Sequence, residues 1–319
     1  MKFASAPAIK IFGRGDRKQA GIALAIVLWL VALLAMMAVS LTTLQRGETA
    51  VTGNLIESAK ATAAAQAGIQ LALLELSRPI AMRQLSTDGA VYEARFDNAT
   101  LWIYVVDEAG KVDLNFASAP LLDVLLHAAD VEDETERARL VDAILDWRDS
   151  DELRRLQGAE AAEYQAAGRN YQPRNAPFKS VEELALVLGM SAPLYHRLAP
   201  AVTIYSGART LNLDSKGALL RAFPHLKEEA LLTSFEEAQN EDSANTTPAA
   251  RNTTVAGHVF TIHCEARLDS GVREGLEAVV RFTSRRSNGP PLQETLAWRE
   301  VEAGMKELTS DSAAIARGQ

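Results

Sequence analysis

The stretch of this 319-residue sequence with the clearest chemical potential is a run of alternating acids at residues 146–152, Asp-Trp-Arg-Asp-Ser-Asp-Glu. Gly-Ala-Glu follows at residues 158–160. Carboxylates spaced along a loop supply the oxygen atoms that Ca²⁺ prefers, since this ion takes about six to eight oxygen ligands. The spacing is not that of an EF-hand, which needs glycine and glutamate at fixed later positions of its loop. Two interpretations stay open from the residues alone, a calcium site and a solvated acidic helix end.

No other set of residues matches a catalytic arrangement. The sequence has no Gly-x-Ser-x-Gly motif and no phosphate-binding glycine loop. Its only cysteine, Cys264, cannot form an intrachain disulfide, and it alternates with Phe260 and Ile262 as in a buried strand. The formal charge of −8 argues against nucleic acid as a ligand. The five histidines are scattered without the spacing of metal ligands: His127, His196, His225, His258 and His263. We therefore predict a protein that is not an enzyme.

Residues 21–45 form an uncharged apolar run, which we expect to anchor the chain that carries these acids. As a helix, residues 22–41 would span about 30 Å, the thickness of the hydrocarbon core of a membrane. Five basic residues and one acid precede the run: Lys2, Lys10, Arg14, Arg17, Lys18 and Asp16. The positive-inside rule then keeps residues 1–20 in the cytoplasm and sends the rest across the membrane. We expect a single-pass inner-membrane protein with most of its chain in the periplasm.

The junction between the basic leader and the apolar run is a glycine, Gly21, followed directly by Ile22. This layout resembles the class III signal of type IV pilins and pseudopilins. The resemblance implies that prepilin peptidase cuts after Gly21 and methylates Ile22, and that the apolar helix is kept as the shaft of a fibre subunit. Two alternatives are a plain signal anchor and a secretory signal cut near residues 38–40, although the apolar run is long for the latter.

The fifth residue after the expected cut indicates which kind of pilin-like subunit the chain resembles. Pilin-like subunits usually carry glutamate there, which pairs with the N-terminal ammonium of a neighbouring subunit, whereas this chain has Ile26. A subunit with nothing above it lacks that partner, so an apolar residue avoids an unpaired carboxylate in lipid. The lack of the glutamate resembles the K minor subunit of type II secretion. The alternative is that Ile26 is simply one more lipid-facing residue.

The rest of the chain alternates between helical and strand-like periodicity. An apolar stripe predicts that the helix continues through residues 46–77, until Pro79 ends it. A capping box is expected where Ser180 precedes Glu183 by three residues. We expect strands at residues 91–96, 101–106, 111–114, 257–268, 271–283 and 296–300. We expect further helices at residues 120–129, 134–147, 158–165, 180–188, 192–198 and 214–223.

The order of these motifs resembles the K subunit over nearly the whole chain. Residues 146–151, 158–160, 178–184 and 204–207 carry the matching patterns. Calcium is known in that family, so the resemblance implies a calcium site with Asp149, Asp151 and Glu160 as ligands. Residues 178–184 followed by Gly189 also resemble helix-hairpin-helix modules, which bind nucleic-acid phosphates. That hairpin has one glycine and acidic surroundings, which favours a structural use.

The predicted fold class is α+β, with a long pilin-like N-terminal helix packed on an antiparallel sheet and inserted SAM-like all-helical units. The expected parts are a leader (1–21), a transmembrane helix (22–45), a pilin-like helix with first strands (46–116), an inserted helical SAM-like domain (117–205), a second SAM-like unit (206–240), a polar loop (241–256), C-terminal strands (257–300) and a flexible tail (301–319).

The function implied is that of a K-type minor pseudopilin at the tip of the pseudopilus, which starts fibre assembly and aids the export of folded proteins. Its implied partners are the minor pseudopilins I and J, the major pseudopilin and prepilin peptidase, with no nucleic acid. Two alternatives remain, a minor pilin of a type IV pilus and a membrane-anchored helix-hairpin-helix DNA-binding protein.

Overall fold

The computed structural model describes residues 20–243, 257–283 and 292–302, and it divides into two compact units, residues 1–57 and 58–319. The expected leader up to residue 19, most of the polar loop and almost all of the tail lie outside the described residues. Helix α1 (Ala20–Leu76) begins in the first unit and ends in the second. Each unit is considered by itself below.

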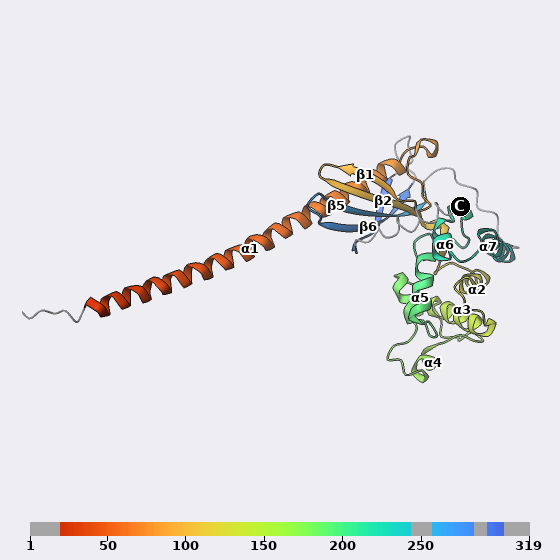
Figure 1. Cartoon of the computed structure of the whole chain (residues 1–319). Helices are drawn as coiled ribbons and strands as arrows, with labels where there is room; N and C mark the ends of the chain where they lie inside the picture. Colours follow the sequence, from red (N-terminus) through yellow and green to blue (C-terminus); the bar gives the residue numbers. More distant parts are fainter. Residues whose placement is uncertain (1–19, 244–256, 284–291, 303–319) are drawn as a thin grey trace, which may run out of the picture. The chain divides into compact units, whose positions relative to one another are not determined.

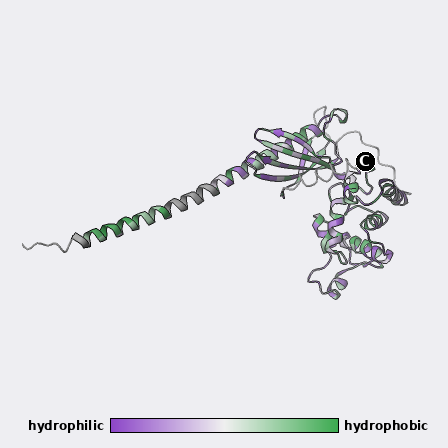
Figure 2. Cartoon of the chain, in the orientation of Figure 1, coloured by the Kyte–Doolittle hydropathy of each residue, from purple (hydrophilic) through white to green (hydrophobic). Residues whose placement is uncertain are grey.

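The first unit contains the apolar half of α1 (Figure 1). The window Ala23–Ser40 has a mean hydropathy of 2.6, and it is long and apolar enough to cross a membrane by length and composition. All its side chains are solvent-exposed within the chain, and Figure 2 shows this part of α1 as strongly hydrophobic. An exposed apolar helix needs lipid or other helices around it, so this segment fits a single-pass membrane anchor.

The second unit contains a five-stranded antiparallel sheet with the order β1-β2-β5-β6-β7. The expected strands are confirmed with small changes in their ends. Asp97 has a φ of 51° and forms a tight turn with Asn98, so the second strand starts at Ala99, two residues earlier than expected. The bounds are β1 Tyr92–Phe96, β2 Ala99–Asp107, β5 Val259–Leu268, β6 Arg273–Thr283 and β7 Leu292–Val301.

The second half of α1 packs on one face of this sheet. Ala61, Ala65 and Ile69 are fully buried and share a core with Leu101 of β2. Gly68 lets the helix approach closely, because a Cβ there would clash with the sulfur of Cys264. Cys264 is fully buried, as expected, and burial raises the pKa of its thiol to about 12. It is therefore a packing residue and not a reactive thiol.

A helical insertion, residues 108–258, lies between β2 and β5 in the chain. β2 and β5 are neighbours in the sheet and pair directly, so the insertion does not interrupt the order of the strands. Its long helices are α2 (Ala119–Ala128), α3 (Glu134–Arg148) and α7 (Glu228–Ser243). Its short α-helices are α4 (Ala161–Ala166), α5 (Ala192–Leu198) and α6 (Gly217–Ala222). A parallel pair of short strands, β3 (Val112–Asp113) and β4 (Val202–Thr203), joins the start of the insertion to the segment that follows α5.

One hydrophobic core runs through the whole insertion. Leu121 of α2, Ile144 of α3 and Phe235 of α7 belong to the same buried cluster. Five short 3₁₀ helices complete the described elements, one before the insertion and four within it: η1 (Ile80–Met82), η2 (Glu108–Gly110), η3 (Val181–Leu186), η4 (Ala199–Ala201) and η5 (Leu213–Ser215).

Two local expectations for the insertion were wrong. The α-helix expected at residues 180–188 is the 3₁₀ helix η3, and Ser180 makes no side-chain cap. Glu183 does not complete a capping box, because its carboxylate accepts a hydrogen bond from the Lys179 amide and pairs with Arg174 at 2.5 Å. The helix expected at residues 158–165 begins only at Ala161, because residues 158–160 pack against the end of α3.

A buried polar joint connects the insertion to the sheet. Asp107, at the end of β2, accepts hydrogen bonds at 3.0 Å from the Ser215 hydroxyl and from Nδ1 of His258. The hydrogen bond to Asp107 raises the pKa of His258, and burial only partly opposes this rise. A histidine whose pKa is raised by folding stabilises the folded state fully below its unfolded pKa, and this contribution is lost as the pH rises through its folded value.

We therefore expect His258→Gln to destabilise the protein most at acidic pH. The loss should be about 1.5–3 kcal/mol below pH ~6.5, as is typical for a hydrogen bond to a charged group, and smaller above pH ~8. Urea unfolding between these pH values measures it. His196→Gln, at an exposed position on α5, is the matched control and should show no such trend. An equal loss at both pH values would contradict a charged His258 in the folded protein.

Candidate functional site

The acidic run lies at the C-terminal end of α3 and in the loop that follows. Asp146 is in the last turn of the helix and is fully buried, and Asp149 ends the helix with extended backbone. The loop then returns so that Glu160 precedes α4 as its N-cap residue. Gly158 makes this return possible, because a Cβ there would clash with the Asp146 carboxylate. The fold thus brings residues 158–160 against the acids of α3.

Three buried oxygen atoms in this region have no hydrogen-bond partner. They are Oδ1 of Asp149, Oε1 of Glu160 and Oδ1 of Asn175. Glu160 is 7% exposed, so water does not compensate its carboxylate freely. Buried polar atoms are normally paired, and each unpaired one costs about 1–3 kcal/mol. Unpaired carboxylate and amide oxygens are the hard ligands that Ca²⁺ binds.

The raised pKa values of the acids in the cluster also favour a bound cation. Burial, followed by the charges of Asp146 and Asp149, raises the pKa of Glu160 to about 6. Burial is also the main cause that raises the pKa of Asp146 to about 6, with Asp149 contributing. The pKa of Asp149 is raised as well, by burial and by Asp151. Four acids therefore repel one another at a partly buried place, and a bound cation would relieve that repulsion.

The three acids predicted as ligands are not equally placed. Asp149 and Glu160 each have a buried side-chain oxygen without a hydrogen-bond partner. Asp151 instead turns to its own loop, where Oδ1 accepts a hydrogen bond from the Leu153 amide at 2.8 Å and its backbone oxygen accepts one from Asn175 at 3.0 Å. Within the described ranges, no three His, Cys, Asp or Glu side chains already form a metal-binding cluster. The chemistry of the donor atoms nevertheless fits a hard cation.

Two members of the cluster were missed as ligand candidates from the sequence. Asp146 lies three residues before Asp149, a helical spacing that puts both on one face, so its signal was present. Asn175 comes from a distant loop, where its φ of 50° suits asparagine, and nothing in its local sequence indicates the contact. Aromatic rings line the other side, with the Trp147 and Tyr164 ring centroids 6.1 Å apart.

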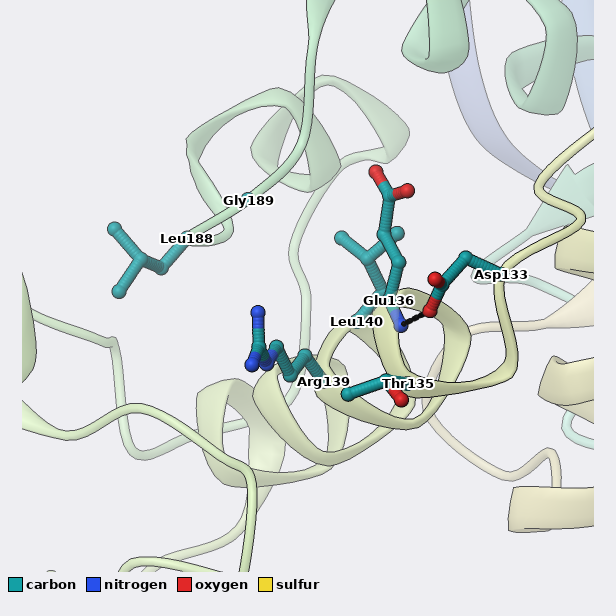
Figure 3. A pocket seen from close by; sticks show the side chains of 7 residues that line it. All are labelled: Asp133, Thr135, Glu136, Arg139, Leu140, Leu188 and Gly189. Atoms are coloured by element: carbon teal, nitrogen blue, oxygen red, sulfur yellow. Dashed lines mark hydrogen bonds between the residues drawn. The ribbon is translucent and has the colours of Figure 1, made fainter.

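A separate cavity of about 540 Å³ lies at the other end of α3, beside the hairpin that resembles helix-hairpin-helix modules (Figure 3). Gly189 has a φ of 90°, and a Cβ there would lie 3.2 Å from Leu140, so glycine serves the turn and the packing. The cavity lining includes Asp133, Glu136 and Arg139. Two carboxylates beside one guanidinium do not suit a phosphate backbone, which favours the structural use of this hairpin.

The residues of the expected processing site lie at the start of α1. The helix begins at Ala20 and runs through Gly21 and Ile22 without a break. Ile26 lies four residues further along, and 63% of its side chain is exposed within the chain. The helical backbone at these positions does not test cleavage, so processing after Gly21 stays a prediction.

Comparison with known proteins identifies the part of the chain that contains the acid cluster. The family model described as type II secretion system (T2SS), protein K matches residues 105–207. Residues 105–207, about a third of the chain, are thus similar to protein K of type II secretion systems. This segment runs from the end of β2 to just beyond β4 and includes every residue of the cluster.

Three relatives carry the description type II secretion system protein K. That of Aeromonas hydrophila is 32% identical over 211 residues, covering 58% of this chain and 63% of the relative. That of Klebsiella pneumoniae is 38% identical over 92 residues, covering 27% and 28%. That of Dickeya chrysanthemi is 40% identical over 73 residues, covering 23% and 20%. The chain thus spans less than two thirds of the length of each of these relatives.

A solved structure extends the likeness to the fold. The crystal structure of the GspK-GspI-GspJ complex from enterotoxigenic Escherichia coli contains a chain that matches this protein with a TM-score of 0.56. The match covers 79% of this chain and 99% of that one, at 16% sequence identity. The predicted α+β class is therefore confirmed, with helices inserted into the antiparallel sheet.

Proposed function

We propose that this protein is a minor pseudopilin that is not an enzyme and that caps the periplasmic pseudopilus of a type II secretion system. In this position it would start fibre assembly with the minor subunits I and J, and aid the export of folded proteins across the outer membrane. The major pseudopilin would follow below this tip. The observation that carries the proposal is the protein K domain inserted into a pilin-like sheet.

The membrane placement is part of the same proposal. The apolar window Ala23–Ser40 would hold the chain in the inner membrane, with the basic leader in the cytoplasm and the sheet and insertion in the periplasm. Prepilin peptidase would remove the leader after Gly21. The helix would then pass from the membrane into the growing fibre.

The bulk of the helical insertion supports the tip position. It joins two adjacent strands and has a core of its own, so it adds a second body to the sheet. A subunit stacked above would have to pass this body. Ile26 supports the same placement, since a capping subunit has no neighbour above that could offer an ammonium group to a glutamate.

The proposal is tested with labelled copies of the full chain. We expect the label at one end of isolated pseudopili, co-purification with subunits I and J, and shorter fibres when the protein is overproduced, because more caps compete for growing ends. Label along the shaft would contradict the tip position. Ile26→Glu should weaken anchoring without improving assembly, since an acid at a membrane centre costs roughly 2.5–3.5 kcal/mol and less near the interface.

The two alternative functions predict different outcomes. A minor pilin of a type IV pilus would share the leader but would assemble with the subunits of that pilus. A membrane-anchored DNA-binding protein would retain double-stranded DNA at moderate salt through the hairpin at Gly189. Retention of DNA would contradict our proposal, and the acids beside that hairpin argue against it.

We further propose that the acid cluster binds Ca²⁺. Asp149 and Glu160 would supply the buried oxygens, with Asn175, Asp151 and the missed Asp146 completing the set. The ion would neutralise the repelling carboxylates and link the end of α3 to the start of α4. Its role would be structural, since it would hold the shape of the insertion at the fibre tip.

A further inference from the structure

The acid cluster already contains a positive charge from its own loop. Nε of Arg155 lies 3.3 Å from Oδ1 of Asp146, and its Nη2 lies 3.5 Å from Oδ2 of Asp149. Its backbone amide also faces the Asp146 carboxylate, at 3.2 Å from Oδ2. Arg155 therefore touches both acids of the α3 end, through its backbone and its side chain.

Arg148, a second basic residue near the cluster, is bonded elsewhere. Arg148 donates hydrogen bonds to the backbone oxygens of Leu114 and Ala117, at 2.5 and 2.7 Å. Burial, with a further contribution from Arg155, lowers the pKa of Arg148 to about 10. Arg148 thus fixes α3 to the segment before α2, and its guanidinium does not bond the carboxylates.

The Arg155 side chain is free to leave. It is 45% exposed, while the acid it contacts, Asp146, is fully buried. The leucines on either side of it in the loop, Leu153 and Leu156, are 78% and 91% exposed, so the loop has no apolar anchor at this point. A guanidinium can therefore turn to solvent without breaking a core contact.

We propose that Arg155 is a built-in counter-ion of the acid cluster that competes with a divalent cation for the same carboxylates. Without the ion, the guanidinium offsets the repulsion between Asp146 and Asp149. When the ion enters, the guanidinium leaves. This inference rests on the proposed calcium site and adds to it a residue that keeps the ion-free protein folded while it weakens metal affinity.

The inference predicts opposite effects of removing Arg155 on the stability of the ion-free protein and on its affinity for the metal. Removing the charge of Arg155 should destabilise the ion-free protein. Asp146 and Asp149 would then lose the guanidinium that this loop places against their carboxylates. The same change should strengthen metal binding, because the ion no longer displaces a competitor. A residue that merely shapes the loop would weaken both.

The experiment uses the full chain in detergent and compares the wild type with Arg155→Gln. Arg154→Gln is the matched control, since Arg154 is adjacent, similarly exposed, and faces Glu163 at 3.5 Å. Calorimetric titration with Ca²⁺ gives the dissociation constant, and Tb³⁺ luminescence sensitised by the nearby Trp147 gives a second, optical readout. Melting is followed in EDTA and in excess Ca²⁺.

We expect Arg155→Gln to bind Ca²⁺ about three- to tenfold more tightly than the wild type, equivalent to about 0.7–1.4 kcal/mol. Its melting temperature should fall in EDTA and recover in Ca²⁺. Arg154→Gln should match the wild type in both measurements. Arg155→Lys, which keeps the charge but loses the planar fork, should lie between wild type and glutamine and serves if the glutamine variant is poorly folded.

The outcomes distinguish the two proposals. If the wild type and all variants bind neither Ca²⁺ nor Tb³⁺, the metal site is wrong and the role of Arg155 falls with it. If the wild type binds Ca²⁺ and Arg155→Gln binds it equally or more weakly, the metal site stands and the competition is overturned.

Discussion

Gly21→Lys is expected to abolish processing, so that the chain accumulates as an uncut precursor. The peptidase of the resembled signal accepts glycine before the cut, and a long charged side chain at the edge of the apolar run would not fit there. The wild-type protein should begin at Ile22 when its N-terminus is sequenced. The effect should be all or none, because no second glycine lies next to the apolar run within the leader.

The control for this prediction adds the same charge elsewhere in the leader. Gly15→Lys should be processed normally, which would exclude an effect of net charge alone. Gly21→Ala should retain part of the processing because alanine is small. A mature N-terminus near Leu41 would instead indicate a secretory signal, and the pilin-like interpretation would then have to be abandoned.

The long elements were predictable because their signals are local. The apolar run from residue 21 can be recognised from its composition alone, and the strand-like periodicity of residues 101–106 and 257–268 predicts β2 and β5. Cys264 could be assigned to a buried strand from its neighbours Phe260 and Ile262 alone. These predictions needed no contact between distant parts of the chain.

The errors arose where a distant contact overrides a local preference. Glu183 has the spacing of a capping box, but Arg174 and the Lys179 amide bind its carboxylate first. The helix expected from residue 158 starts late because Gly158 must lie against Asp146. Tertiary contacts of this kind are invisible in a window of a few residues.

The candidate site also combines residues that the sequence indicates with residues that only the fold brings together. Its acids are a sequence signal, but Arg155 enters it through the return of the loop after α3, and Asn175 enters it from a separate loop after α4. The sequence predicted Asp151 as a ligand on the same footing as Asp149, whereas the fold gives Asp149 and Glu160 the buried unpaired oxygens. Burial and pairing, which decide which acid can bind a metal, are properties of the folded chain.

Calcium should raise the thermal stability of the folded protein substantially. An ion that binds only the folded state adds about 2.7 kcal/mol at a concentration one hundred times its dissociation constant. For a folded unit of this size that corresponds to several degrees in melting temperature. Mg²⁺ should give a smaller shift, because it is smaller, demands octahedral geometry and gives up its water reluctantly.

Variants of single acids locate the site within the cluster. Glu160→Gln should remove most of the calcium-dependent shift, and Asp151→Ala a smaller part of it, because the Asp151 carboxylate is already hydrogen-bonded to its own loop. Glu160→Gln should also raise the melting temperature in EDTA, because it removes one of the repelling charges. Glu152→Gln, at an exposed acid of the same loop, is the matched control and should keep the full shift. Scanning calorimetry of the full chain in EDTA, Ca²⁺ and Mg²⁺ measures all three. If Glu152→Gln loses the shift as completely as Glu160→Gln, calcium acts through the general negative charge of the loop and the defined site is wrong.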